Sequence, residues 1–267
     1  MKRITSRENA AYKELKLLAG SSQARRKAGR TVLDGVHLCQ VYLAQVGVPA
    51  ACVASESALD LPEVGALVQE CTSRGAQVLV LGDALYDGLS QVENGVGILF
   101  VIDTPAQARA PALTRSAVLL DNLQDPGNVG SILRSAAAAG IKDVFCSRGT
   151  VFAWAPKVLR AGMGAHFLLN IVENTDLGEL MRGASVPVLA TSSHADATIF
   201  DADLSRPLAW IFGHEGQGVA PPLLELAQQR VSIPHAEQRV ESLNVAACAA
   251  VCLFEQVRQQ RQAGKRA

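Results

Sequence analysis

The sequence lacks the signatures of several protein classes. Its six cysteines include no CxxC pair and no cysteine–histidine cluster with zinc spacing. Cys248 and Cys252 are four residues apart, but no His, Asp or Glu has the matching spacing to complete a metal site. No apolar stretch approaches the roughly 20 residues that cross a membrane, and the N-terminus lacks the apolar core of a secretory signal. These absences predict a cytoplasmic protein with reduced, buried cysteines.

Common catalytic and nucleotide-binding motifs are also missing. No GxGxxG follows a strand-like run, and no GxxxxGK[ST] occurs; "GMGAH" at Gly162–His166 begins like the first motif and then departs from it. None of the five histidines is paired with a nearby serine or cysteine nucleophile. A dinucleotide oxidoreductase, a triphosphate enzyme and a triad hydrolase are therefore disfavoured.

The net charge is zero, but the first 30 residues carry nine basic and only two acidic side chains, a local charge of +7. A cationic segment on a neutral protein fits contacts with nucleic-acid phosphates, because neutralised phosphates release counterions. The solvated face of an amphipathic helix explains the same charges equally well.

Residues 31–103 alternate short β-rich runs ("TVL", "ACVA", "QVLVL", "VGILFVID") with helical patterns, which predicts a small α/β unit. No set of catalytic side chains converges in it. Residues 105–112 contain two prolines and small residues typical of a linker. The sequence thus predicts an N-terminal domain over 1–104 and a second domain over 113–267.

The second domain contains six apolar runs at helix-plus-strand spacing, followed by a long C-terminal helix. The runs are "SAVLLD", "DVFCS", "HFLLNIV", "VPVLATS", "LAWIFG" and "RVSIP". Near-continuous apolar strands are typical of a parallel sheet covered by helices on both faces. Ligands in such α/β folds bind at the carboxyl ends of the strands.

Three loops at these strand ends have unusual chemistry: "DNLQDPGNVG" at 121–130, "GHEGQGV" at 213–219 and "HAEQRVESLN" at 235–244. We expect them to converge on one edge of the sheet. The glycines of the second loop either let a nucleotide-like cofactor approach the backbone or only redirect the chain.

Polar residues in these loops have two interpretations each. Glu215 would accept hydrogen bonds from a ligand or hold its turn through backbone amides, and the structural role is slightly favoured. Ser242 and Asn244 precede the C-terminal helix, where either would serve as an N-cap without further function.

Taken together, in this order and spacing, the three loops resemble the motifs of the SpoU/TrmH family of RNA ribose methyltransferases, in the SPOUT superfamily. The resemblance covers the whole second domain. "PKVLRAGMGAHF" also resembles a family segment, with Gly162 where serine is common. "RRKAGRTVLDGVHL" is similar to the opening of the family's substrate-binding domain, with Asp34 where glutamate is usual.

The resemblance implies an enzyme that transfers a methyl group from S-adenosylmethionine to a ribose 2′-hydroxyl of structured RNA. It also implies a C-terminal trefoil knot and a homodimer, and no metal. Ribosomal RNA is favoured as substrate because a separate N-terminal domain of this type commonly accompanies it in the family. The alternatives are a tRNA 2′-O-methyltransferase and a non-catalytic RNA-binding relative.

The resemblance assigns residues to two roles. Asn128 and Arg134 match the catalytic motif. The positions that match the cofactor loops are Thr191, Gly213, Glu215, Gly218, Ile233, Ser242, Leu243 and Asn244.

Arg134 is the only charged residue between Asp125 and Lys142. Its neighbours at helical spacing are small (Ser131, Ser135 and Ala138), which leaves its side chain room to reach a substrate. A guanidinium is not deprotonated in proteins, so we expect it to stabilise a phosphate or a developing oxyanion rather than to act as a base. In the structural alternative it caps a neighbouring element or pairs with Asp121 or Asp125.

Overall fold

A computed structural model describes the chain except for residues 91–94, 107–109, 193–194, 196, 236–241 and 266–267. The described chain forms two compact units. The first contains Met1–Ala106 and Trp154–Phe167, and the second contains Gln107–Ala153 and Leu168–Ala267. Part of the expected linker, residues 107–109, lies outside the described residues.

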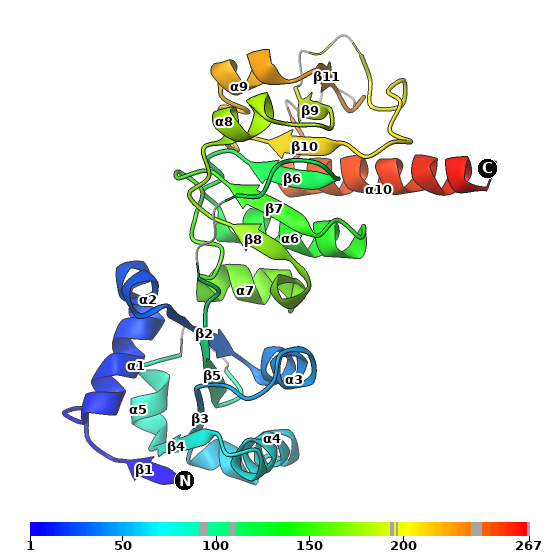
Figure 1. Ribbon diagram of the computed structural model, residues 1–267. Helices are drawn as coiled ribbons and strands as arrows, with labels where there is room; N and C mark the ends of the chain where they lie inside the picture. Colours follow the sequence, from blue (N-terminus) through cyan, green and yellow to red (C-terminus); the bar gives the residue numbers. More distant parts are fainter. Residues whose placement is uncertain (91–94, 107–109, 193–194, 196, 236–241, 266–267) are drawn as a thin grey trace. The chain divides into compact units, whose positions relative to one another are not determined.

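The first unit is built on a mixed sheet with the strand order β1-β4-β3-β5-β2 (Figure 1). Strand β5 is antiparallel to β2 and β3, whereas β4 pairs in parallel with β1 and β3. The four expected strands are present, and β1 is an addition that the sequence analysis missed. The strands are β1 (Lys2–Ile4), β2 (Arg30–Asp34), β3 (Ala51–Ser55), β4 (Gln77–Leu81) and β5 (Ile98–Asp103).

Helices cover both faces of this sheet. Residues of α1 and α5 belong to one core cluster together with residues of the strands. Helices α3 and α4 pack against each other and against strands of the same sheet. The helices are α1 (Ala10–Gly20), α2 (Ser22–Ala28), α3 (Val36–Gln45), α4 (Pro62–Ser73) and α5 (Asp83–Asp87), with a 3-10 turn at Ser57–Asp60.

The cationic first 30 residues contribute several side chains to the core of this unit. Ile4, Leu15 and Leu18 are buried in the main cluster. Arg25 is itself buried, and its Nη1 donates to the carbonyl oxygens of Leu18 (2.7 Å) and Ala19 (3.0 Å). Deleting this segment would remove core residues, so a role of its charges in RNA binding can be tested only by substitution.

The segment Trp154–Phe167, expected in the second domain, groups with the first unit. It contains α7 (Pro156–Gly162), which packs on β2. The buried Thr31 hydroxyl donates to the Trp154 carbonyl oxygen at 2.7 Å, and Phe167 packs edge-on against Tyr42 with ring centroids 5.3 Å apart. These contacts join residues distant in sequence, which explains why local patterns did not predict them.

The second unit contains a six-stranded, wholly parallel sheet with the order β11-β9-β10-β6-β7-β8 (Figure 1). Five of the six apolar runs contain one of its strands and the sixth, "RVSIP", overlaps β11, so the prediction of a parallel α/β sheet is confirmed. The strands are β6 (Ala117–Leu120), β7 (Asp143–Cys146), β8 (Asn170–Val172), β9 (Val188–Thr191), β10 (Ala209–Phe212) and β11 (Gln229–Val231).

Helices again cover both faces. Helix α8 (Leu177–Arg182) packs with α9 (Pro221–Leu226), and α6 (Pro126–Ala138) packs with α10 (Val245–Gly264). A 3-10 turn at Ala165–Leu168 precedes β8.

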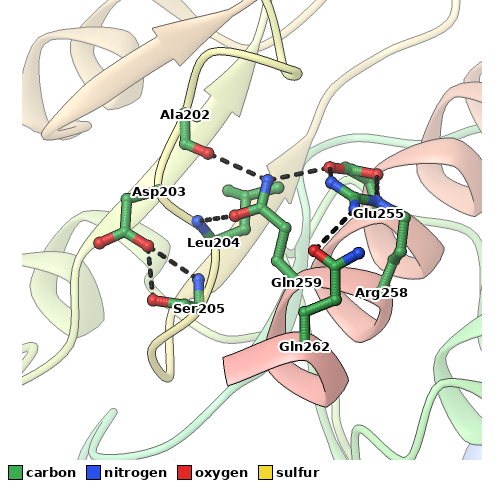
Figure 2. Close-up of polar contacts among 8 residues, drawn as sticks. All are labelled: Ala202, Asp203, Leu204, Ser205, Glu255, Arg258, Gln259 and Gln262. Atoms are coloured by element: carbon green, nitrogen blue, oxygen red, sulfur yellow. Dashed lines mark hydrogen bonds and ion pairs between the residues drawn. The ribbon is translucent and has the colours of Figure 1, made fainter. Parts of the chain in front are cut away.

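Helix α10 is fixed along its length. The Trp210 indole N–H donates to Gln256 Oε1 at 2.9 Å, and Leu253 is fully buried. Farther along, the Gln259 amide donates to the Ala202 carbonyl oxygen (3.1 Å) and accepts from Leu204 N (2.9 Å), as Figure 2 shows. These contacts anchor the middle and second half of α10 in the second unit.

Two further features concern the cysteines and the helices of the described chain. All six cysteines are free thiols, and five of them are buried, whereas Cys248 is half-buried. No described helix is both long enough and apolar enough to traverse a bilayer.

Candidate functional site

A pocket of about 660 Å³ lies at the carboxyl ends of β9, β10 and β11, where the chain also enters α10. Seven of the eight residues predicted to bind the cofactor line it: Thr191, Gly213, Glu215, Gly218, Ile233, Ser242 and Leu243. The eighth, Asn244, lies between the lining residues Leu243 and Val245. The second and third loops therefore meet at this pocket, although residues 236–241 of the third lie outside the described residues. The 121–130 loop does not line the pocket, but it contacts the second loop through Glu215.

The 213–219 loop folds closely on itself. A Cβ added at Gly213 would lie 2.1 Å from the backbone nitrogen of Val219, and Gly218 has a left-handed φ of 70°. Both positions therefore require glycine for the loop's own conformation. Gly216 has no such constraint, because its added Cβ would approach the His214 ring no more closely than 3.8 Å.

Glu215 connects this loop to the loop that follows β6. Its carboxylate accepts hydrogen bonds from Gln124 N (3.1 Å), Asp125 N (3.0 Å) and Asn128 Nδ2 (3.1 Å). Partial burial opposes ionisation of Glu215, but the hydrogen bonds from Asp125, Asn128 and Gln124 outweigh it, so the pKa of Glu215 is lowered. Glu215 does bind backbone amides, but they belong to the neighbouring loop as well as to its own.

Glu215→Gln is expected to destabilise the second unit near neutral pH and to have a smaller effect in acid. Because the pKa of Glu215 is lowered by folding, its ionised form contributes stability above the unfolded-state pKa. That contribution is lost as the pH falls through the folded-state pKa, and glutamine resembles the protonated acid. Urea unfolding of both proteins at about pH 6 and about pH 3.5 tests this. An equal difference in unfolding free energy at the two pH values would contradict it.

Asn128 and Asn244 extend the same network to α10. Asn244 Nδ2 donates to Asn128 Oδ1 at 2.9 Å, while Asn244 Oδ1 accepts from Ala246 N (2.9 Å) and Ala247 N (3.2 Å). Asn244 is thus the N-cap of α10, as one interpretation of the sequence predicted. A continuous chain of hydrogen bonds runs from the β6 loop through Glu215 and Asn128 to the start of α10.

Arg134 lies outside this network. It is exposed on α6, does not line the pocket, and makes no hydrogen bond or ion pair with any described residue. The structural alternative fails for the described chain, because Asp125 Oδ1 accepts from Asn128 N (2.8 Å) and Asp121 Oδ2 from Ala220 N (2.9 Å) instead. The structure brings Asn128 together with Glu215 and Asn244, and leaves the Arg134 guanidinium free.

The sequence model of the SpoU rRNA Methylase family matches residues 115–254, slightly more than half of the chain and nearly all of the second unit. The chain belongs to this family. The predicted family is confirmed, and with it the class of RNA methyltransferases.

Several relatives match almost the whole chain. An uncharacterized tRNA/rRNA methyltransferase of Synechocystis sp. is 34% identical over 96% of this chain and 94% of its own length. The 23S rRNA (guanosine(2553)-2′-O)-methyltransferase of Bacillus subtilis is 29% identical over 95% and 98%. The crystal structure of the SpoU methyltransferase AviRb of Streptomyces viridochromogenes with AdoMet has a TM-score of 0.85, at 26% identity, covering 95% and 98%.

Sequence reasoning missed several residues of this SpoU-family site. Gln124 and Asp125 bind Glu215 through backbone N–H groups, so their side-chain types gave no signal. Cys248, expected in the core, lines the pocket. Contact with Cys252 lowers the pKa of the Cys248 thiol, and the Thr191 hydroxyl acts in the same direction. The four-residue spacing of the two cysteines was the available signal.

Proposed function

We propose that this protein transfers a methyl group from S-adenosylmethionine to a ribose 2′-hydroxyl of structured ribosomal RNA in the cytoplasm. The main support is the hydrogen-bond chain from Glu215 through Asn128 to Asn244, which joins the three family motifs beside one pocket. The relatives with assigned substrates support ribosomal RNA, since their names specify 23S rRNA. The trefoil knot is part of the same proposal and rests on the family resemblance.

The pocket suits S-adenosylmethionine in size and chemistry. Its volume of about 660 Å³ lies within the range of small-molecule sites. Ile233 and Leu243 offer apolar surface for an adenine ring, and the 213–219 loop offers backbone groups without bulky side chains. Thr191 and Ser242 supply hydroxyl groups. We assign these residues to cofactor binding together with Gly213, Glu215, Gly218 and Asn244.

The bound cofactor supplies a methyl group that is already activated by its sulfonium charge. The protein must therefore orient the ribose hydroxyl and stabilise the negative charge that develops on its oxygen. We assign that stabilisation to Arg134, whose guanidinium is not engaged within the described structure. Asn128 holds the adjoining loop through Glu215 and Asn244.

A methyl-transfer assay tests the proposed function. The protein is incubated with methyl-labelled S-adenosylmethionine and undermethylated ribosomal or transfer RNA, and the product is digested to nucleosides. We expect label in a 2′-O-methylated nucleoside from the ribosomal fraction. Label on transfer RNA alone would correct the substrate, and label only on a base would contradict the reaction. RNA binding without any transfer would favour the non-catalytic alternative.

We also propose that the protein is a homodimer through the outer face of α10. On one face of this helix, Ala249 and Leu253 are fully buried in the protein's own core. Val251 and Phe254 remain 38% and 48% exposed on this helix. Exposed apolar side chains on a helix anchored along its opposite face favour a protein contact.

Light scattering is expected to give a mass near twice the 28.2 kDa of one chain at micromolar concentration. Phe254→Asp should shift that mass toward the monomer, because association would bury an unpaired charge. Lys157→Ala, an exposed substitution in the first unit, is the matched control. A wild-type monomer at this concentration would contradict the proposal.

A further inference from the structure

A second cavity, of about 540 Å³, lies beside the cofactor pocket in the second unit. Its walls come from residues that follow β6, β7, β8 and β10. It shares three residues of the 213–219 loop with the cofactor pocket, so this loop borders both spaces. Both cavities lie at the carboxyl edge of one parallel sheet, which is the edge where such folds bind ligands.

The loop that carries Arg148 into this cavity is held on both sides of that residue. Asn122 N donates to Ser147 Oγ at 2.9 Å, and Ser147 N donates to the Leu120 carbonyl oxygen at 2.9 Å. On the other side, the Gln124 side-chain amide donates to the Gly149 carbonyl oxygen. A Cβ added at Gly149 would lie 2.2 Å from Asn122 Oδ1, so the two loops are in direct contact.

The Arg148 side chain, in contrast, is exposed and makes no hydrogen bond or ion pair within the described chain. A guanidinium on a fixed backbone can bind an anion with little further ordering of the loop, and its planar fork matches a phosphate. The acidic residues of the cavity wall are engaged elsewhere: Asp121 Oδ2 accepts from Ala220 N (2.9 Å), and Asp176 Oδ1 accepts from Glu179 N (2.9 Å).

The cavity also offers a donor for a base. His214 Nδ1 lies 3.0 Å from Gly216 N and 3.3 Å from Gln217 N, and both of these are donors. The neutral imidazole therefore carries its hydrogen on Nε2. With Asn122 and Thr175 in the same wall, the space combines the Arg148 guanidinium and neutral polar groups with the two hydrogen-bonded carboxylates of Asp121 and Asp176. It thus offers a cation for a phosphate and hydrogen-bonding groups for a base.

We propose that this cavity binds a nucleotide of the RNA substrate, with the Arg148 guanidinium on its phosphate. The proposal rests on the proposed function, and it names the surface that holds the RNA strand beside the cofactor pocket. Arg148 is then a substrate-binding residue that does not contact the cofactor.

Arg148→Ala tests this proposal. The control variant is Arg206→Ala, which removes an arginine that precedes β10 at the opposite edge of the sheet. RNA binding is measured by filter binding from 50 to 200 mM salt, and S-adenosylmethionine binding by calorimetry. Arg148→Ala should weaken RNA binding about five- to tenfold and make the salt slope shallower by roughly 0.7 to 0.9, as expected for one lost phosphate contact. Cofactor affinity should stay within about twofold of wild type, because Arg148 does not line that pocket.

Arg148→Lys should restore the salt slope but only part of the affinity, because lysine keeps the charge and loses the fork. Equal salt slopes for Arg148→Ala and Arg206→Ala would overturn the proposal, as would loss of cofactor binding in Arg148→Ala. Failure of the proposed function would look different, since the wild type itself would transfer no methyl group to RNA.

Discussion

Replacing Arg134 by alanine is expected to lower the turnover number by about 10²- to 10³-fold, the usual cost of losing one donor to a developing oxyanion. Affinity for S-adenosylmethionine should change little, because Arg134 does not line the cofactor pocket. Stability should also change little, because the side chain is exposed and makes no polar contact in the described structure. Single-turnover methyl transfer, cofactor calorimetry and thermal unfolding measure the three quantities.

Arg134→Lys identifies how the arginine acts. Lysine preserves the positive charge but not the planar, bidentate geometry of the guanidinium. Partial activity would indicate that the positive charge alone stabilises the transition state. Activity as low as that of the alanine variant would indicate that the planar, bidentate guanidinium is required. If Arg134→Ala instead unfolded the protein or abolished cofactor binding, with normal turnover in the folded remainder, Arg134 would be a structural residue.

The position of Arg134 outside the pocket lining raises the question of which protomer it serves in the proposed dimer. Mixing Arg134→Ala with a variant deficient in cofactor binding answers it. If the arginine acts across the dimer, each mixed dimer contains one complete site, and an equal mixture regains about a quarter of the wild-type activity. If it acts within its own chain, the mixture stays inactive.

The sequence predicted the second unit well, because the strands β6, β7, β9 and β10 are buried on both faces and so appear as near-continuous apolar runs. The convergence of the three loops followed from the same inference, since parallel strands bring their carboxyl ends to one edge. The backbone partners of Glu215, Gln124 N and Asp125 N, were not predictable, because backbone amides carry no residue-specific signal. Strand β1 was missed because only Ile4 among its three residues is buried.

The division of the chain between units shows a second limit of local patterns. Trp154–Phe167 lies between β7 and β8 in sequence, and its apolar spacing fits either unit. What assigns it to the first is a buried hydrogen bond between residues 123 positions apart, Thr31 and Trp154. Threonine is a common residue in strands. The hydrogen bond from Thr31 to the distant Trp154 carbonyl oxygen could therefore not be predicted from the sequence.

A second large effect, a loss of affinity for S-adenosylmethionine, is expected when the 213–219 loop is displaced. A matched pair of glycine variants in this loop tests it. In Gly213→Ala the new Cβ would meet three backbone atoms, at 2.1 Å (Val219 N), 2.2 Å (Gly218 C) and 2.3 Å (Gly218 O). No side-chain rotation relieves these contacts, so the loop itself must move. Overpacking of this kind costs about 1 to 3 kcal/mol. If the displaced loop is restored by the bound cofactor, affinity for S-adenosylmethionine should fall roughly 10- to 100-fold.

Gly216→Ala is the control, because the same methyl group there meets only the His214 ring, at 3.8 Å, and needs no left-handed backbone. Its melting temperature should match the wild type, and its cofactor affinity should remain within about twofold. The comparison separates the two interpretations of these glycines. If both variants lose affinity while Gly216→Ala keeps full stability, the cofactor approaches the backbone at Gly216 as well. If Gly213→Ala keeps wild-type affinity, the close turn at Gly213 does not shape the cofactor pocket, and our assignment of that residue is wrong.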